Sequence, residues 1–514
     1  MAEHVSPRPP VTDPNRSRRP HPGVPGAGPP DPVDRRALDE AVHGTAELIR
    51  MDTVNHGGGE GREREAAEWV AERLAGAGLE PRMLEKAPGR TNVVARLPGS
   101  DPRADALLVH GHLDVVPADA ADWTVPPFAG EIRDGVVWGR GAVDMKNAVA
   151  MTVALVRAWS RAGVRPRRDI VLAFTADEED TAEYGAGHLV GEHADLFEGC
   201  TEAIGESGAF TCHTEDGRRL YPVAAGERGT SWVRLTARGR AGHGSKVNRE
   251  NAVARLAAAV SRIDEHHWPL RPAPAVRAAL VELAVLHDVP PPRGEGTPGA
   301  PGTPENTAGG DSGGDLADDP RRAWEAVLAD TPGDPAGIAT RERAVTELLE
   351  ALGPAAVLVN STLRNSANPT ALDAGGKVNV IPGRAVGAVD GRVVPGGEEE
   401  FTETMDRLTG PWVDWEYHHH KEPLEAPLDS RTYAVLRGSL LHFDPGAHVV
   451  PYFMSGGTDA KQFARLGIVG YGFTPLRLPP GFDYQAMFHG VDERVPVEAL
   501  HFGVRVLDRA LRTL

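Results

Sequence analysis

The chain has 514 residues, which exceeds one ordinary hydrophobic core and therefore predicts two ordered domains. Its 73 acidic and 55 basic side chains give a formal net charge of −18, which argues against nucleic acid and anionic membranes as partners. Cys200 and Cys212 are the only cysteines, so a disulfide scaffold is excluded and a reducing compartment is indicated.

The N-terminal segment, residues 1–33, is rich in proline, arginine and glycine and has no hydrophobic periodicity. This composition predicts a disordered tail. The segment also lacks the apolar region of a secretory signal, and no apolar run in the chain approaches the length of a membrane span. We therefore expect a cytoplasmic protein.

Helical and strand patterns alternate after this tail. Residues 61–78 have apolar side chains at helical spacing, and strands are predicted at 91–97 and 106–109. An apolar helix over 147–163 and a buried strand over 169–175 follow. This alternation predicts an α/β fold, in which ligands bind beyond the carboxyl ends of the strands.

Ionisable side chains follow several of the predicted strands. His112 and Asp114 lie two residues apart after the strand at 106–109, so both can face one side, and Asp114 can hold the imidazole in one tautomer. Imidazole and carboxylate groups are ligands for divalent cations, so the set predicts a two-metal hydrolase. The other members, in chain order, are Asp144, Glu178, Glu179, Glu206 and His489.

Each of these features taken singly has an ordinary structural explanation. A carboxylate such as Asp144, at the start of a helix, is stabilised by the helix dipole whether or not a metal binds. The four adjacent acidic residues at 177–180 fit a charged surface loop, although their mutual repulsion would be relieved by a cation. It is the combination of several such strand ends that favours a metal centre.

The pattern changes near residue 226. Strands and helices then follow in a β-α-β-β-α-β order, which predicts a small split-βαβ domain over 226–421, inserted into a domain made of 34–225 and 422–514. A Pro/Gly/Thr/Asp tract at 290–320 predicts a disordered loop inside it, followed by helical material at 321–352. The predicted elements of the insertion are strands at 230–238, 357–363, 377–394 and 412–419, and helices at 251–263 and 398–408.

Seven short motifs occur in order along the chain: HGHLDVVP, WGRGAVDMKN, TADEED, GHGS, KVNVIPGRA, GGTDA and FHG. As a set they resemble family twenty of the metallopeptidases, which includes aminoacylases, glutamate carboxypeptidases, acetylornithine deacetylases and succinyl-diaminopimelate desuccinylases. The match covers most of residues 40–512; the Pro-rich head and the interruption at 290–350 depart from it. The resemblance implies an α/β/α zinc-exopeptidase-like catalytic domain with an inserted α+β, ferredoxin-like domain that serves as a lid and in dimerisation.

The resemblance also implies a site for two divalent ions, most often Zn²⁺, although carboxylate-rich sites also take Co²⁺ or Mn²⁺. Such a site leaves room for a water molecule whose proton a nearby carboxylate can accept. Asp144 would bridge the two ions, His112 and Glu206 would complete one set of ligands, and Glu179 and His489 would complete the other.

Catalytic and substrate-binding roles follow from the same resemblance. Glu178 would be the general base, and Asp114 would orient His112. His243 of GHGS would stabilise the tetrahedral oxyanion, in several family members across a dimer. Asn379, Arg392 and Gly456 would hold the substrate's carboxylate, for which an arginine fork can donate two parallel hydrogen bonds.

Two of these assignments have ordinary alternatives. His243 also reads as a turn residue without a partner, and Arg392 as a surface residue of a strand. Family members have DIR or DVR where this chain has DGR, with Gly391 in the middle.

The resulting prediction is a di-metal amidohydrolase that cleaves the amide bond of N-acyl amino acids or short peptides bearing a free carboxylate. Its partners would be small-molecule substrates, not nucleic acid or membrane, and a second copy bound through the lid. An aminopeptidase of the related clan has the same pattern of an H-x-D motif, a bridging Asp and paired Glu residues. It needs no inserted lid, so residues 226–421 argue against it. A non-catalytic metal-binding relative is the other alternative; such relatives usually lack a ligand or the base, and every one of these positions is filled here.

Overall fold

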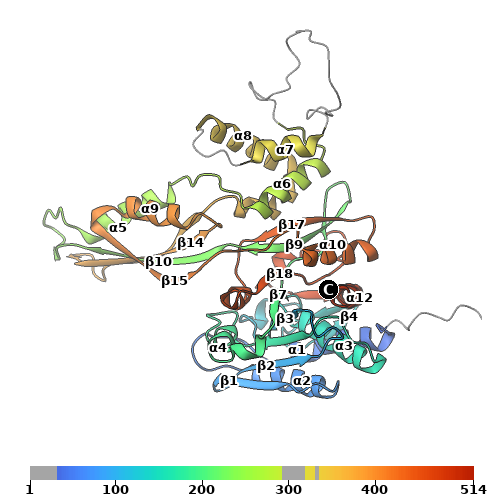
Figure 1. Cartoon of the computed structure of the whole chain (residues 1–514). Helices are drawn as coiled ribbons and strands as arrows, with labels where there is room; N and C mark the ends of the chain where they lie inside the picture. Colours follow the sequence, from blue (N-terminus) through green and yellow to red (C-terminus); the bar gives the residue numbers. More distant parts are fainter. Residues whose placement is uncertain (1–31, 292–318, 330–334) are drawn as a thin grey trace, which may run out of the picture.

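The computed structural model describes residues 32–291, 319–329 and 335–514 (Figure 1). The predicted disordered segments at 1–33 and 290–320 fall almost wholly outside these described residues. Within the described part of the chain, no helix is both long enough and apolar enough to cross a membrane.

The larger sheet has ten strands, in the main order β1-β2-β6-β3-β7-β18-β9-β16, with β8 and β17 also paired to β9. Its central strands β6, β3, β7 and β18 run parallel, so their carboxyl ends meet at one edge. The ten strands are β1 (Arg82–Ala87), β2 (Arg90–Leu97), β3 (Ala106–His112), β6 (Ile170–Thr175), β7 (Cys200–Gly205), β8 (Cys212–His213), β9 (Arg219–Glu227), β16 (Leu424–Glu425), β17 (His448–Met454) and β18 (Val469–Gly472).

Helices cover both faces of this sheet. Leu107 and Val109 of β3 belong to an apolar cluster that also contains side chains of α1, α3 and α12, while Leu108 between them belongs to a second cluster with α4 and α11. Alternate residues of a strand face opposite sides, so the two clusters are the two faces of an α/β/α sandwich. The helices are α1 (Arg35–Arg50), α2 (Arg64–Ala75), α3 (Lys146–Ala162), α4 (Ala186–Glu192), α10 (Arg431–Phe443), α11 (Ala460–Phe463) and α12 (Val497–Thr513).

A separate four-stranded antiparallel sheet has the order β12-β14-β10-β15. Val233 and Leu235 of β10 pack with Leu256 of α5 and Phe401 of α9, so the two helices cover one face of the sheet. The elements follow the predicted β-α-β-β-α-β order, and Figure 1 shows them extending to one side of the larger sheet. They are β10 (Gly229–Arg238), α5 (Ala252–Asp264), β12 (Ser366–Asp373), β14 (Arg384–Val393), α9 (Glu398–Thr409) and β15 (Val413–Lys421).

The strand predicted at 357–363 is wrong. Short 3-10 turns occupy Gly353–Leu358 and Asn360–Thr362, and the apolar side chains there belong to the core of the larger domain. The second strand of the small sheet is instead β12, whose polar sequence contains Pro369. Proline lacks a backbone donor and is tolerated on a strand at the edge of a sheet, which is where β12 lies.

Three further helices fall within the predicted insertion but pack elsewhere. α6 (Pro274–Leu286) lies against β17, and α7 (Pro320–Leu328) and α8 (Pro335–Leu352) join it in the apolar cluster of the larger sheet. This part of 226–421 therefore differs from the prediction in its packing: it extends the larger domain, and only the ends of the insertion build the four-stranded sheet.

Two small sheets complete the fold. β11 (Gly242–His243) pairs with β13 (Val380–Ile381) beyond the end of β10. β4 (Glu131–Arg133), β5 (Val136–Trp138) and β19 (Arg494–Pro496) form a three-stranded sheet. This sheet joins the segment before α3 to the segment before α12, two stretches that lie far apart in the sequence.

Candidate metal centre

Five side chains form two groups that share one residue. In each group, ligand atoms from three residues lie within 4.8 Å of one another, and Asp144 belongs to both groups. The Nε2 atom of His112 lies 3.1 Å from Asp144 Oδ1 and 3.5 Å from Glu206 Oε2. The Nε2 atom of His489 lies 3.3 Å from Asp144 Oδ2 and 3.0 Å from Glu179 Oε2.

The topology of the larger sheet explains why these residues meet. His112 ends β3, Glu179 follows β6, and Glu206 directly follows β7, and these three strands are parallel neighbours. Asp144 lies two residues before α3, and His489 lies in the loop before β19. The carboxyl edge of the sheet therefore collects side chains from five separate stretches of sequence.

Two of the three carboxylates in these groups, those of Glu179 and Glu206, are placed where their negative charge is unfavourable. Burial and the nearby Asp144 carboxylate raise the pKa of Glu179 to about 7, and burial raises the pKa of Glu206 to about 7. The Oε1 atom of Glu179 is buried and has no hydrogen-bond partner among the described residues. A divalent cation would stabilise the charged carboxylates, and a set of carboxylate oxygens and imidazole nitrogens suits Zn²⁺, Co²⁺ or Mn²⁺. The residues therefore fit a pair of divalent ions.

The carboxylates of the two groups also shift the pKa values of the two histidines. Hydrogen bonds to Asp144 and Glu179 raise the pKa of His489 to about 10. Burial acts to lower the pKa of His112, but the Glu206 and Asp144 carboxylates outweigh it and raise that pKa. Each imidazolium proton thus occupies a position between carboxylates that a metal ion would take, so metal binding has to displace these protons.

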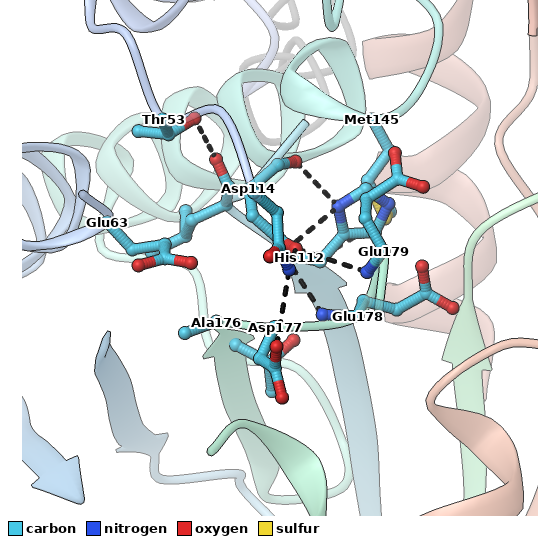
Figure 2. Close-up of polar contacts among 12 residues, drawn as sticks. Thr53, Glu63, His112, Asp114, Met145, Ala176, Asp177, Glu178 and Glu179 are labelled. Carbon is cyan, nitrogen blue, oxygen red and sulfur yellow. Dashed lines mark hydrogen bonds and ion pairs between the residues drawn. The ribbon is translucent and has the colours of Figure 1, made fainter. Parts of the chain in front are cut away.

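Asp114 organises the loop that follows β6. His112 Nδ1 lies 2.9 Å from the main-chain carbonyl oxygen of Asp114 and 3.6 Å from its Oδ1. The Asp114 carboxylate accepts hydrogen bonds from the main-chain N–H groups of Glu178 (3.2 Å) and Glu179 (3.1 Å), as Figure 2 shows. The orienting contact predicted for the Asp114 side chain is therefore made more closely by its main chain, and its carboxylate holds the two glutamates instead.

Glu178 belongs to neither group of ligand atoms. Its main chain is held by Asp114, and Figure 2 shows its side chain leaving the loop in a different direction from that of Glu179. Burial and the Glu206 carboxylate raise the pKa of Glu178 well above its ordinary range. A carboxylate beside a metal site, but not among its ligands, has the arrangement needed for a general base.

Arg392 lies at one end of β10, whereas His243 and Asn379 lie beyond its other end. Arg392 pairs with Thr230 at the end of β10 that joins the larger domain, whereas Arg384 pairs with Arg238 at the far end. The ten residues of β10 span roughly 30 Å at about 3.3 Å per residue.

His243 and Asn379 lie together beyond the far end of β10. The N–H of Gly244 donates to the carbonyl oxygen of Asn379 at 2.9 Å, and His243 is exposed. In Figure 1 this end projects away from the large sheet. The structure thus brings the five predicted ligands together but leaves His243 and Asn379 outside the metal centre of their own chain.

Gly456, by contrast, lies on the larger domain between β17 and α11. Its loop is tied to the metal-centre edge because the Thr175 hydroxyl, at the end of β6, donates to the carboxylate of Asp459 at 2.6 Å.

Known proteins share the fold and the family motifs of this chain. The family model of peptidase family M20/M25/M40 matches residues 108–513. The chain belongs to this peptidase family. It is therefore a hydrolase of the metallopeptidase and amidohydrolase class, and both the resemblance seen in the motifs and the α/β fold class are confirmed.

Curated relatives include the N-fatty-acyl-amino acid synthase/hydrolase PM20D1 of Xenopus tropicalis, which is 25% identical over 482 residues, covering 92% of this chain and 85% of that protein. The succinyl-diaminopimelate desuccinylase of Cereibacter sphaeroides is 35% identical over 237 residues, covering 46% of this chain and 57% of that protein.

Solved structures show the same fold at low identity. The metallo-carboxypeptidase Sso-CP2 of Sulfolobus solfataricus superposes with a TM-score of 0.62 at 16% identity, covering 92% of this chain and 99% of that one. The Bacillus subtilis YXEP protein, described as a dinuclear metal binding peptidase, superposes with a TM-score of 0.55 at 11% identity, covering 93% and 99%.

One departure from the family pattern, Gly391 in DGR, has a packing explanation. A Cβ atom at this position would lie 2.4 Å from the carbonyl oxygen of Ser231 and 2.5 Å from the Phe401 ring. Phe401 is itself stacked on Trp268 with ring centroids 5.3 Å apart. A residue larger than glycine is excluded here because the Ser231 carbonyl oxygen and the Phe401 ring fill the space of its side chain.

Sequence reasoning missed a buried network behind Asp114. Asn55 Nδ2 donates to the carboxylates of Asp114 (2.9 Å) and Asp177 (3.2 Å), and Arg90 donates to Asn55 Oδ1 at 2.8 Å. Arg90 also forms a buried ion pair with Glu63. These residues come from separate elements before and after β3, so no local motif marks them.

Proposed function

We propose that this protein is a di-metal amidohydrolase that cleaves the amide bond of an N-acyl amino acid or a short peptide with a free carboxylate. The observation that carries the proposal is the pair of ligand groups that share Asp144, beside the partly buried side chain of Glu178. The names of the relatives, an N-fatty-acyl-amino acid synthase/hydrolase and a desuccinylase, support an acylated amino acid as substrate.

The metal ligands would be His112, Asp144 and Glu206 for one ion and Asp144, Glu179 and His489 for the other. Zn²⁺ is the ion that best suits this mixture of imidazole and carboxylate donors, with Co²⁺ and Mn²⁺ as alternatives. When bound, such ions supply Lewis-acid chemistry that acidifies a water molecule and polarises the scissile carbonyl.

Glu178 would accept the proton of the attacking water at its carboxylate and then donate it to the nitrogen of the departing amine. Asp114 would act as a positioning residue, since its carboxylate holds the main chain of Glu178 and Glu179. Arg392 would bind the substrate's carboxylate near the junction of the two domains, with the main chain at Gly456 beside it. Its guanidinium is already oriented by Asp390, whose Oδ1 lies 2.7 Å from Arg392 Nε.

His243 and Asn379 would complete the site from a second copy of the chain, through a homodimer of the small sheets. Their position roughly 30 Å along β10 from the junction supports this arrangement, because a residue there is better placed to reach a neighbouring molecule than its own metal centre. His243 would then donate a hydrogen bond to the oxyanion of the tetrahedral intermediate.

We assign a cytoplasmic location on the basis of the two cysteines, which are both unpaired. The acidic surface supports small molecules, not nucleic acid or membrane, as the partners.

The test is amino-acid release from a panel of N-acyl amino acids and dipeptides, measured with added Zn²⁺ and again after chelation. We expect release that is lost on chelation and restored by metal, and the order of the panel will define the acyl group and side chain preferred. Cleavage confined to substrates with a free amino terminus would instead establish an aminopeptidase. Two bound metal ions without any release would establish a binding protein.

A further inference from the structure

Glu493 is a fully buried carboxylate four residues after His489. All four of its hydrogen bonds go to the segment that ends at Asp144. One oxygen accepts from the main-chain N–H groups of Val143 (2.7 Å) and Asp144 (3.1 Å), and the other accepts from the N–H of Gly141 (2.9 Å) and the guanidinium of Arg140 (2.8 Å).

This contact matters because residues 139–145 have no regular secondary structure of their own. The N–H groups of a turn that converge on one anion form a nest, and the anion then fixes the path of the turn. The Glu493 carboxylate is that anion. Asp144, the residue common to both ligand groups, lies near the end of this turn.

Glu493 also ties the turn to the segment that carries His489. Its main-chain carbonyl oxygen accepts from the N–H of Gly139 at 2.9 Å, and the next residue, Arg494, pairs with Trp138 in the three-stranded sheet. One residue thus connects the positions of two ligands, Asp144 and His489, that lie 345 residues apart in sequence (489 minus 144).

We propose that Glu493 is a positioning residue that sets the location of Asp144 between the two groups of ligand atoms and its distance from His489. The proposal rests on the proposed function only in requiring that the two ligand groups bind metal. Groups that hydrogen-bond to the residues around a metal site commonly change metal affinity about 10- to 100-fold when they are replaced.

The experiment compares Glu493→Gln with Glu498→Gln, whose side chain is 90% exposed on the first turn of α12. Metal-free protein is titrated with Zn²⁺ alone in competition with a chromophoric chelator. Because an amide places its own N–H group against two of the four donors, we expect Glu493→Gln to weaken zinc binding about 10- to 100-fold. The Glu498→Gln protein should bind as the unmodified chain does.

A merely structural role predicts a different result. In that case Glu493→Gln lowers the unfolding temperature of the metal-free protein but leaves the zinc dissociation constants unchanged, which would overturn the proposal. The absorption spectrum of the protein saturated with Co²⁺ gives a second readout, since displacement of Asp144 changes the bands of the bound ion, and an unchanged spectrum with unchanged affinity would also overturn it.

If Glu493→Gln does not fold, Arg140→Lys provides a milder change, because lysine retains the charge but cannot reproduce the guanidinium geometry. We expect it to weaken zinc binding by a smaller factor in the same direction, and unchanged affinity would overturn the proposal. Weakened zinc binding without any hydrolysis of the panel would refute the proposed function alone. Hydrolysis with unchanged zinc affinity in the Glu493 variant would refute only the role of Glu493.

Discussion

The side chains of the metal centre and those beyond the far end of β10 differ in their burial and in the hydrogen bonds that hold them. At the metal centre, His112 is 1% exposed and its Nε2 lies 3.1 Å from Asp144, while Asp114 is fully buried and accepts from the main-chain N–H of Glu178. At the far end, His243 lies on an exposed two-stranded turn beside Asn379, and among the described residues its ring is hydrogen-bonded to Ser245 alone.

This difference separates two tasks of a hydrolase. The chemistry of water activation needs fixed distances, and the ligands that provide it come from one chain and one sheet edge. In the proposed function, recognition of the transition state and of the substrate's carboxylate would use residues that lie apart in the chain, so it would depend on assembly. The predictions below test this division, from the largest expected effect to the smallest.

Replacing the proposed base should cost the most. Glu178→Gln should lower kcat about 10²- to 10⁴-fold, because the amide cannot accept the proton of water, while both metal ions stay bound. Steady-state kinetics together with metal analysis would check this. Asp180→Asn, an exposed carboxylate two residues further along, is the matched control and should have little effect. Near-normal turnover of Glu178→Gln would refute the assignment.

The far end of the small sheet is tested by His243→Ala, which should lower kcat about 10²- to 10³-fold as expected for loss of one oxyanion donor. His418→Ala, which removes an exposed histidine of β15 in the four-stranded sheet, should not. Mixing the inactive Glu178→Gln and His243→Ala proteins should restore roughly a quarter of the activity, because mixed dimers then contain one intact site. A mixture that stays inactive would mean that His243 does not act across a dimer.

Arg392→Ala should raise KM for carboxylate substrates about 10- to 100-fold, with a smaller effect on kcat, since a charge-assisted hydrogen bond contributes about 1.5–3 kcal/mol. Arg384→Ala is the control, because Arg384 lies at the other end of the same strand. An unchanged KM in Arg392→Ala would remove this residue from carboxylate binding.

Metal affinity should fall more steeply as the pH drops below about 7. Burial raises the pKa of Glu179 and Glu206 from an ordinary value of 4.5 to about 7, so these groups gain protons in that range, and metal has to displace them. Without metal, the folded state binds more protons than the unfolded state between these two pH values. Its free energy of unfolding should therefore decrease as the pH rises through this window.

Zinc titrations and thermal unfolding of the metal-free protein at about pH 5 and about pH 7 would check both signs. Greater stability of the metal-free protein at the higher pH would contradict the pKa shifts that define the centre.

Several elements of the fold were accessible from sequence because their signals are local. The helix predicted over 147–163 is α3, and the buried strand over 169–175 is β6, both strongly apolar runs with clear ends. The edge strand β12 was missed because it is polar and contains a proline, while the apolar run at 357–363 was assigned to a strand although it packs as turns in the larger core.

By itself, the sequence determined the α/β class, the β-α-β-β-α-β order of the small sheet and the candidate ligand side chains, because strand ends and short motifs encode these locally. Only the tertiary structure decided that Glu493 holds the turn of Asp144, and that Arg392 lies at one end of β10 whereas His243 lies beyond the other end. The physical reason is that these relations depend on strand order and on hydrogen bonds between residues hundreds of positions apart, which no local pattern records.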